Sequence, residues 1–132
     1  MASAQCDKKF NMVADTVYQL QPDSSRGDDI PGHATIKLTK DSIHVLMQMS
    51  DGNKFELKGK NTSTVCKMNA DYSEGSIELV YDAVLYARGN EKNDKMFFTV
   101  TGKGGQLKIV GAPESNMSDK ICFVVSKKEE AR

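Results

Sequence analysis

The sequence predicts an α+β fold, in which an antiparallel sheet of about eight strands curls into a half-barrel or barrel with one amphipathic helix packed on it. Three observations predict this fold. Short runs of alternating apolar and polar residues recur along the chain, turn signals separate these runs, and one segment changes to a helical period. The 132 residues can bury one core and are too few for two.

The first half of the chain carries the clearest strand signals. Phe10 to Leu20 is expected to be a strand, and residues 21–32, rich in Pro, Gly and Asp, to be a loop. Alternation of apolar and polar side chains predicts half-buried strands over 33–39 and 43–49. Asp51-Gly52 favours a tight hairpin turn between strands, because this pair readily adopts positive φ angles.

The next strands are predicted from composition. Residues 54–58 form the partner of the hairpin, with Phe55 and Leu57 facing the core. Gly59-Lys60-Asn61 is expected to turn the chain, and the β-branched residues of 62–68 favour another strand.

The period then changes. Five apolar residues are spaced at i, i+3, i+4, i+7 and i+8, which is one face of a helix: Ile77, Val80, Tyr81, Val84 and Leu85. Ser76 is suited to the N-cap, and Gly89 follows Arg88 as a stop signal. The pattern predicts a helix from Ser76 to Arg88.

Three more strands are expected to complete the sheet. They cover residues 96–101, 107–110 and 121–125, after a polar connector at 90–94 and with a loop at 111–116. Because the connections between strands are short, the pairing should be an antiparallel meander. We divide the chain into an N-terminal arm (1–9), a single β-rich domain (10–126) and a solvated, frayed charged tail (127–132).

Composition excludes several classes of function. Eighteen basic residues balance eighteen acidic ones, which argues against nucleic-acid binding. No apolar run is long enough for a transmembrane segment, and the N-terminus lacks the apolar region of a secretory signal. We therefore expect a cytoplasmic protein. If Ala2-Ser3-Ala4 is instead the remnant of a trimmed signal, the protein is secreted, and the sequons at Asn61 and Asn116 gain meaning.

No catalytic signature is present, and we expect neither enzymatic activity nor a cofactor nor a metal. His33 and His44 are interpreted as surface imidazoles, because no ligand partner lies at metal-binding spacing. The three cysteines, Cys6, Cys66 and Cys122, are too scattered for a disulfide framework, although a Cys66–Cys122 bridge is the alternative in a secreted protein.

Two features of the loop at 21–32 are weaker signals. The acidic residues Asp23, Asp28 and Asp29 lack the spacing of an EF-hand calcium site. Arg26-Gly27-Asp28 spells the tripeptide that integrins read, and chance accounts for it in a loop of this composition.

The chain holds seven methionines, and Met47, Met49 and Met68 lie in strands that would line one face of the sheet. They either fill an irregular core or form a flexible surface that accepts a protein partner. As a candidate partner surface we retain these three residues.

The order of elements, with Ser63-Thr64-Val65-Cys66, a helix containing Ile77-Glu78, and Gly105-Gln106-Leu107-Lys108-Ile109, resembles the META domain family. This family includes bacterial HslJ-like proteins and virulence-associated proteins of protozoa, and the protozoan branch fits better. The resemblance spans Phe10 to Val110. It departs from the family in lacking Trp and in having Ser50-Asp51-Gly52-Asn53 at the turn. It implies a non-enzymatic role in protein interaction, secretion or virulence, and transfers no catalytic residue.

Two alternatives remain open. A carrier of calycin type, whose eight antiparallel strands close around a small apolar molecule, has a similar length, although the expected helix interrupts the strands midway. A secreted β-rich effector of a pathogen is the other, suggested by the N-terminal residues and the sequons.

Overall fold

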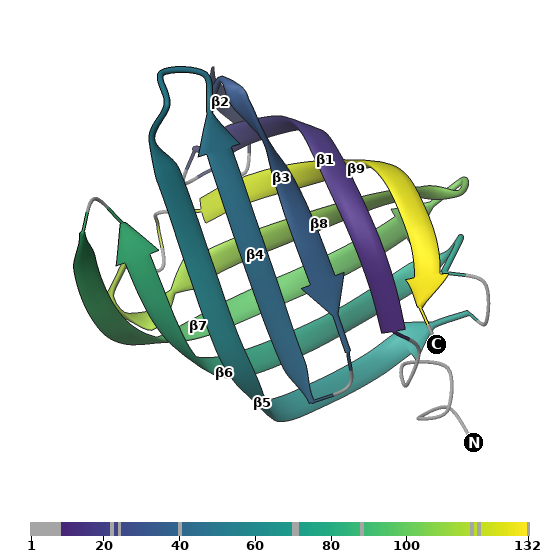
Figure 1. The fold of residues 1–132 in the computed structure, drawn as a ribbon. Coiled ribbons are helices and arrows are strands. Elements are labelled where there is room, and N and C mark those ends of the chain that lie inside the picture. Colours follow the sequence, from purple (N-terminus) through teal and green to yellow (C-terminus); the bar gives the residue numbers. More distant parts are fainter. Residues whose placement is uncertain are drawn as a thin grey trace.

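The computed structural model describes residues 9–21, 23, 25–39, 41–69, 72–87, 89–116, 118 and 120–131. Nine strands form a single antiparallel sheet. Their bounds are β1 Lys9–Leu20, β2 Arg26–Asp29, β3 Gly32–Leu38, β4 Ser42–Met49, β5 Lys54–Met68, β6 Gly75–Ala87, β7 Asn90–Lys103, β8 Gln106–Pro113 and β9 Lys120–Ala131 (Figure 1). Most of the N-terminal arm, including Cys6, and Arg88 of the expected helix lie outside the described residues.

Eight of these strands close into a barrel (Figure 1). β1 pairs with β3 on one side and with β9 on the other, so the meander returns to its start. The β1–β9 ladder runs from Lys9↔Ala131 to Leu20↔Lys120 with irregularities near Ala14. Closure satisfies the backbone groups that an open sheet leaves unpaired at its edges. The expected antiparallel meander and the barrel are confirmed.

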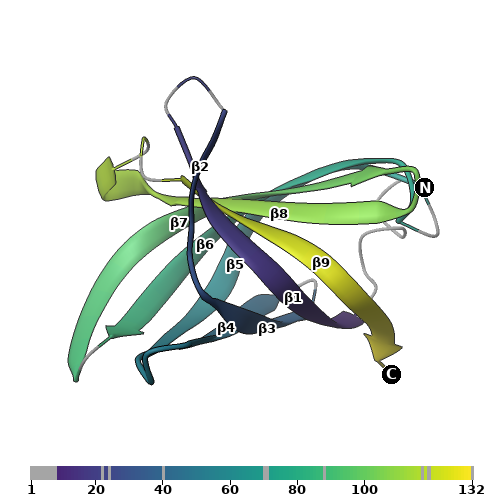
Figure 2. The same ribbon diagram turned by 90° about the horizontal axis from the view of Figure 1, so that it is seen from above.

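β2 is an addition to the barrel. It pairs only with β1, through Tyr18↔Asp29 and Leu20↔Arg26, and its hairpin projects from the wall (Figure 2). The expectation of a loop throughout 21–32 was therefore wrong in part.

The predicted helix is wrong, because Gly75–Ala87 is strand β6, paired with β5 and β7 along its whole length. Inward positions alternate as Ile77, Leu79, Tyr81 and Ala83, all buried. Val80 and Val84 lie on the outer face, half-buried. With apolar residues on both faces, the segment satisfies the helical and the strand periods together, and its β-branched and aromatic content favours the strand. The only helical segment in the described part is the short 3₁₀ turn Glu114–Asn116.

β5 is continuous where a turn at Gly59-Lys60-Asn61 was expected. Its register with β6 shifts between Asn61 and Ser63, and this irregularity lets the strand bend and serve two walls of the barrel (Figure 1). Gly59 is required for packing: a Cβ there would lie 2.9 Å from Cβ of Tyr81 and 3.2 Å from a methyl carbon of Ile43. Gly59 therefore marks a close approach of Tyr81 and Ile43 within a continuous strand, and not a turn of the chain.

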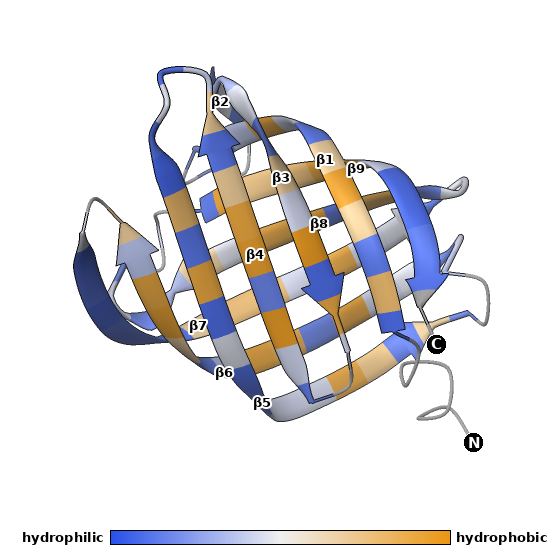
Figure 3. Ribbon diagram, viewed as in Figure 1, coloured by the Kyte–Doolittle hydropathy of each residue, from blue (hydrophilic) through white to orange (hydrophobic). Residues whose placement is uncertain are grey.

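Other strands are longer than expected. The polar connector at 90–94 is the start of β7, and β8 takes in residues 111–113 of the expected loop. Residues 127–131, expected to be a frayed tail, belong to β9 and pair with β1, with exposed side chains at 127–130. Strand alternation is visible as alternating colours along β3, β4 and β5 (Figure 3).

The core fills the barrel. Ala34, Ile36 and Leu38 of β3, and Ile43, Val45 and Met47 of β4, point inward and are each no more than 5 % exposed. Full burial of one such aliphatic side chain contributes about 2 kcal/mol relative to exposure. No helix in the described chain has the length and apolarity to cross a bilayer.

Tyr72, in the described part of the segment between β5 and β6, packs into the core. Tyr72 is 1 % exposed, and its ring centroid lies 4.6 Å from that of Phe10. Its backbone adopts φ +60°, in the left-handed region. The Gly105 amide donates to the Ser73 carbonyl at 3.2 Å, and the Gly104 amide donates to the Glu74 carboxylate at 3.0 Å. These bonds tie Ser73 and Glu74 to the β7–β8 turn.

Candidate functional site

An apolar pocket of about 140 Å³ lies inside the barrel, toward the end that carries the β4–β5, β6–β7 and β8–β9 connections. Strands β4 to β9 all contribute to it. Its lining consists of Val45, Phe55, Leu57, Leu85, Met96, Phe98, Gly111, Pro113, Ile121 and Phe123. No charged side chain is among these residues, so the pocket suits an uncharged ligand.

Phe98 and Gly111 set part of the pocket wall. They are cross-strand partners on β7 and β8, and the Phe98 ring packs closely against the glycine. A Cβ at Gly111 would lie 2.5 Å from Cε1 of Phe98. Any side chain at this position would therefore displace the ring.

Tyr81 packs against two of the residues that line the pocket. It pairs across the strands with Met96, which lines the pocket, and its ring meets Phe98 edge to face with centroids 5.8 Å apart. Tyr81 is fully buried, and its hydroxyl makes no hydrogen bond of acceptable geometry with any described residue. Burial raises the pKa of Tyr81 far above its ordinary value, opposed in part by the neighbouring Asn61 side chain.

The pocket is small. An engineered cavity of about 150 Å³ in another protein holds benzene, whereas sites for drug-sized ligands start at about 300 Å³. One aromatic ring or a short alkyl group fits the space, and a whole fatty-acid chain does not.

The three methionines chosen from the sequence lie elsewhere. Met47 and Met68 are each 2 % exposed and belong to the core cluster, and Met49 is half-buried against it. None of the three lines the pocket. Two of the three side chains are therefore packed inside the barrel and are not displayed at the surface of the protein.

The residues that do form the pocket were not singled out from the sequence. Gly111 was expected to begin the loop at 111–116. In the structure it lies within β8, where a glycine allows the close approach of Phe98. Pro113 was also expected in that loop, and the other lining residues read as ordinary core positions. Only closure of the barrel brings six strands around one space.

The histidines lie on the outer face. His33 is exposed, and His44 pairs with Glu56 across β4 and β5 at 2.6 Å between Nε2 and Oε2. The hydrogen bond from His44 holds the pKa of Glu56 below its ordinary value. Among the described residues, no three His, Cys, Asp or Glu side chains gather as a metal site.

Cys122 is a free thiol, 2 % exposed, so the alternative Cys66–Cys122 bridge is wrong, whereas Cys66 is itself disulfide-bonded. It lies opposite Tyr18 in the β1–β9 ladder. Contact with Cys122, followed by burial, raises the pKa of Tyr18. Arg26, the first residue of the tripeptide noted above, lies over the Tyr18 ring at 4.3 Å and pairs with Asp29 at 2.8 Å, so its guanidinium is already engaged.

The fold and the pocket define a class: an up-and-down antiparallel β-barrel with an internal apolar pocket at one end. No family model, no curated protein and no solved structure matches the chain. The META resemblance stays a prediction, and the helix that was to contain Ile77 and Glu78 is strand β6.

Proposed function

We propose that the protein is a small-ligand carrier that takes an uncharged apolar group, such as one aromatic ring or a short alkyl chain, into the pocket at the end of its barrel. The pocket lining carries this proposal, because ten residues from six strands surround the space without a charged side chain among them. Binding would displace no ion pair and would bury apolar surface on both partners.

The carrier interpretation agrees with the architecture. Closed barrels of eight antiparallel strands have an interior wide enough for side chains with room for one small ligand. Here Phe98, Phe123 and Met96 belong to the buried core and also line the pocket. The ligand is therefore limited to the space of about 140 Å³ that they and the other lining residues leave. The interaction role implied by the META resemblance remains a separate hypothesis to which no described residue gives specific support.

The test is the thermal stability of the protein with benzene as the probe. A ligand that binds only the folded state raises Tm in proportion to its occupancy. Near saturation in water, benzene should raise Tm of the native protein, whereas sodium acetate at equal concentration should not.

Two matched variants on β9 locate the binding. Ile121→Phe fills the pocket and should abolish the benzene effect, while Val124→Phe, on the outer face of the same strand and also half-buried, should retain it. An equal rise in Tm for both variants, or none in the native protein, would overturn the proposal.

A further inference from the structure

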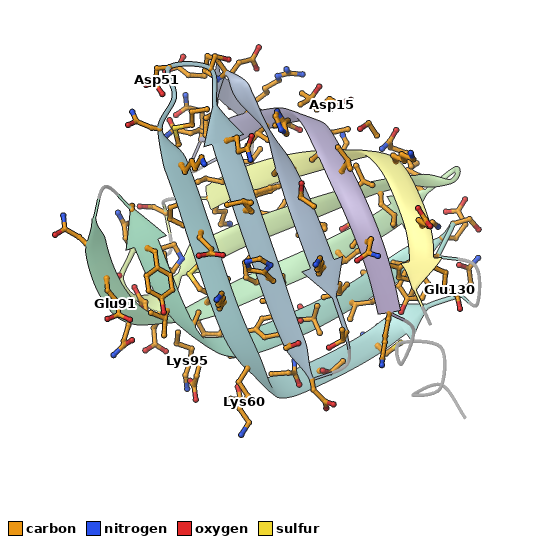
Figure 4. The ribbon with its side chains drawn as sticks, in the orientation of Figure 1. Asp15, Asp51, Lys60, Glu91, Lys95 and Glu130 are labelled. Carbon is orange, nitrogen blue, oxygen red and sulfur yellow. The ribbon has the colours of Figure 1, made fainter. Side chains whose placement is uncertain are left out.

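A second and larger hollow lies on the outer surface of the barrel. It occupies about 520 Å³ between the β4–β5 turn and the β6–β7 hairpin, which lie at the same end of the molecule (Figures 1 and 4). Glu91 marks its β6–β7 side and Asp51 the tip of the opposite turn (Figure 4). We call this hollow the hairpin groove. Among the described residues it is lined by Leu46, Lys54, Glu56, Tyr86 and Glu91, together with Gly52, Asn53, Ala87, Gly89 and Asn90.

An aromatic side chain occupies the middle of the groove. Tyr86 is 38 % exposed, and it and Val65 are the exposed large hydrophobic residues of the described chain. In the sheet register Tyr86 stands between Glu56 on β5 and Glu91 on β7, and Leu46 follows Glu56 on β4. One row of outward side chains across four strands thus places an aromatic ring between two carboxylates with an aliphatic group at one end.

Both carboxylates act on the Tyr86 side chain. Glu56 already accepts a hydrogen bond from His44 through Oε2, at 2.6 Å, and this bond holds the pKa of Glu56 below its ordinary value. Tyr86 pairs across the strands with Glu56 on one side and Glu91 on the other, and partial burial, then Glu91, then Glu56 raise the pKa of Tyr86. Lys54 also lines the groove but forms no ion pair with either glutamate, both of which are described.

We propose that the hairpin groove binds an organic cation, an alkylammonium or alkylguanidinium group whose charge lies between Glu56 and Glu91 against the Tyr86 ring and whose alkyl stem packs on Leu46. Aromatic faces attract cations, and flanking carboxylates add to this attraction. The cation could be a free amine or the side chain of a lysine or arginine in a peptide. This site is separate from the barrel pocket and does not depend on it.

The test uses n-butylguanidinium as the probe, followed by chemical shifts of the backbone amides of residues 52–56 and 89–91. Neutral n-butanol and anionic butyrate are matched probes of the same length. The guanidinium should bind saturably, the alcohol more weakly by about threefold or more, and butyrate not at all.

Substitutions test which side chains of the hairpin groove hold the bound cation. Glu91→Gln and Tyr86→Leu should each weaken binding by about threefold. Glu78→Gln, an exposed glutamate on the same strand β6 and outside the groove, should leave binding unchanged. Lys54→Gln removes a competing positive charge and should tighten binding. Weaker binding in Lys54→Gln, an unchanged affinity in Glu91→Gln, or equal binding of n-butanol would overturn the proposal.

A blocked tripeptide with a central arginine distinguishes the two sources of the cation. Tighter binding of the tripeptide than of n-butylguanidinium supports a protein partner, because the peptide backbone then adds contacts to the two turns. Equal affinity supports a free small cation. Benzene should displace neither n-butylguanidinium nor the tripeptide, because it binds in the barrel pocket. Competition between benzene and either probe would contradict two separate sites.

Discussion

Replacing Tyr81 with Phe is expected to stabilise the protein. The hydroxyl is fully buried and has no acceptable hydrogen bond among the described residues, and leaving such a group unpaired costs about 1–3 kcal/mol. Asn61 lies close enough to lower the pKa of Tyr81, so some of this cost is already offset. We therefore expect a gain near the lower bound, about 1 kcal/mol.

The substitution leaves the packing of the ring intact. The edge-to-face contact with Phe98 and the close approach to Gly59 involve the ring and Cβ, which Phe retains. A gain of about 1 kcal/mol should raise Tm by about 3–4 °C in a domain of this size.

The assay is urea unfolding, in which the midpoint should rise while the slope of the unfolding free energy against urea is unchanged. A control variant, Tyr86→Phe, removes a hydroxyl from an exposed tyrosine and should change stability little. A loss of stability in Tyr81→Phe would refute the reasoning, because it would mean that the buried hydroxyl has a favourable partner.

Four further outcomes are expected. Burial raises the pKa of Tyr81 above its ordinary value of 10.0, so on raising the pH the unfolded chain loses this proton before the folded one. The free energy of unfolding should therefore fall above pH 10, and it should fall less in Tyr81→Phe, as urea unfolding at alkaline pH can show. Gly59→Ala should cost about 1–3 kcal/mol in urea unfolding, since its Cβ would lie 2.9 Å from that of Tyr81. Tyr72→Ala should lower the free energy of unfolding by about 3 kcal/mol through loss of the contact with Phe10, and an unchanged Tm would show that the core does not need this ring. The Cys122 thiol, 2 % exposed, should react with a maleimide only under unfolding conditions, as peptide mass spectrometry can establish.

The strands with one polar and one apolar face were predictable from the sequence. Residues 33–39 alternate strictly, and β3 and its buried Ala34, Ile36 and Leu38 follow the pattern. The hairpin at Asp51-Gly52 was equally well marked, since Gly52 has the positive φ of +93° that the turn requires.

β6 was not predictable in the same way, for a physical reason. Its outward Val80 and Val84 are half-buried on the barrel surface, so the apolar residues satisfy two periods at once. Tertiary pairing with β5 and β7 decides between them, and local sequence does not encode that pairing.

The pocket likewise depends on pairing between strands that are far apart in the sequence. Phe98 and Gly111 become neighbours through the β7–β8 register, and Leu57 and Ile121 share a cavity only because the barrel closes between β1 and β9. Sequence patterns place Leu57, Phe98 and Ile121 in strands, whereas Gly111 was expected to lie in a loop. The methionines drew attention by their number, whereas the space is defined by a glycine and by aromatic rings.

The most direct test of ligand binding in the barrel is a titration with benzene followed by the methyl NMR signals of the protein. Leu85, Met96 and Ile121 line the pocket and carry methyl groups, while Val65 and Val124 lie on the outer face as internal controls. The account predicts saturable shifts of the three pocket signals with one common affinity and no change at the two controls. Shifts that fail to saturate, or that affect the outer valines equally, would contradict it.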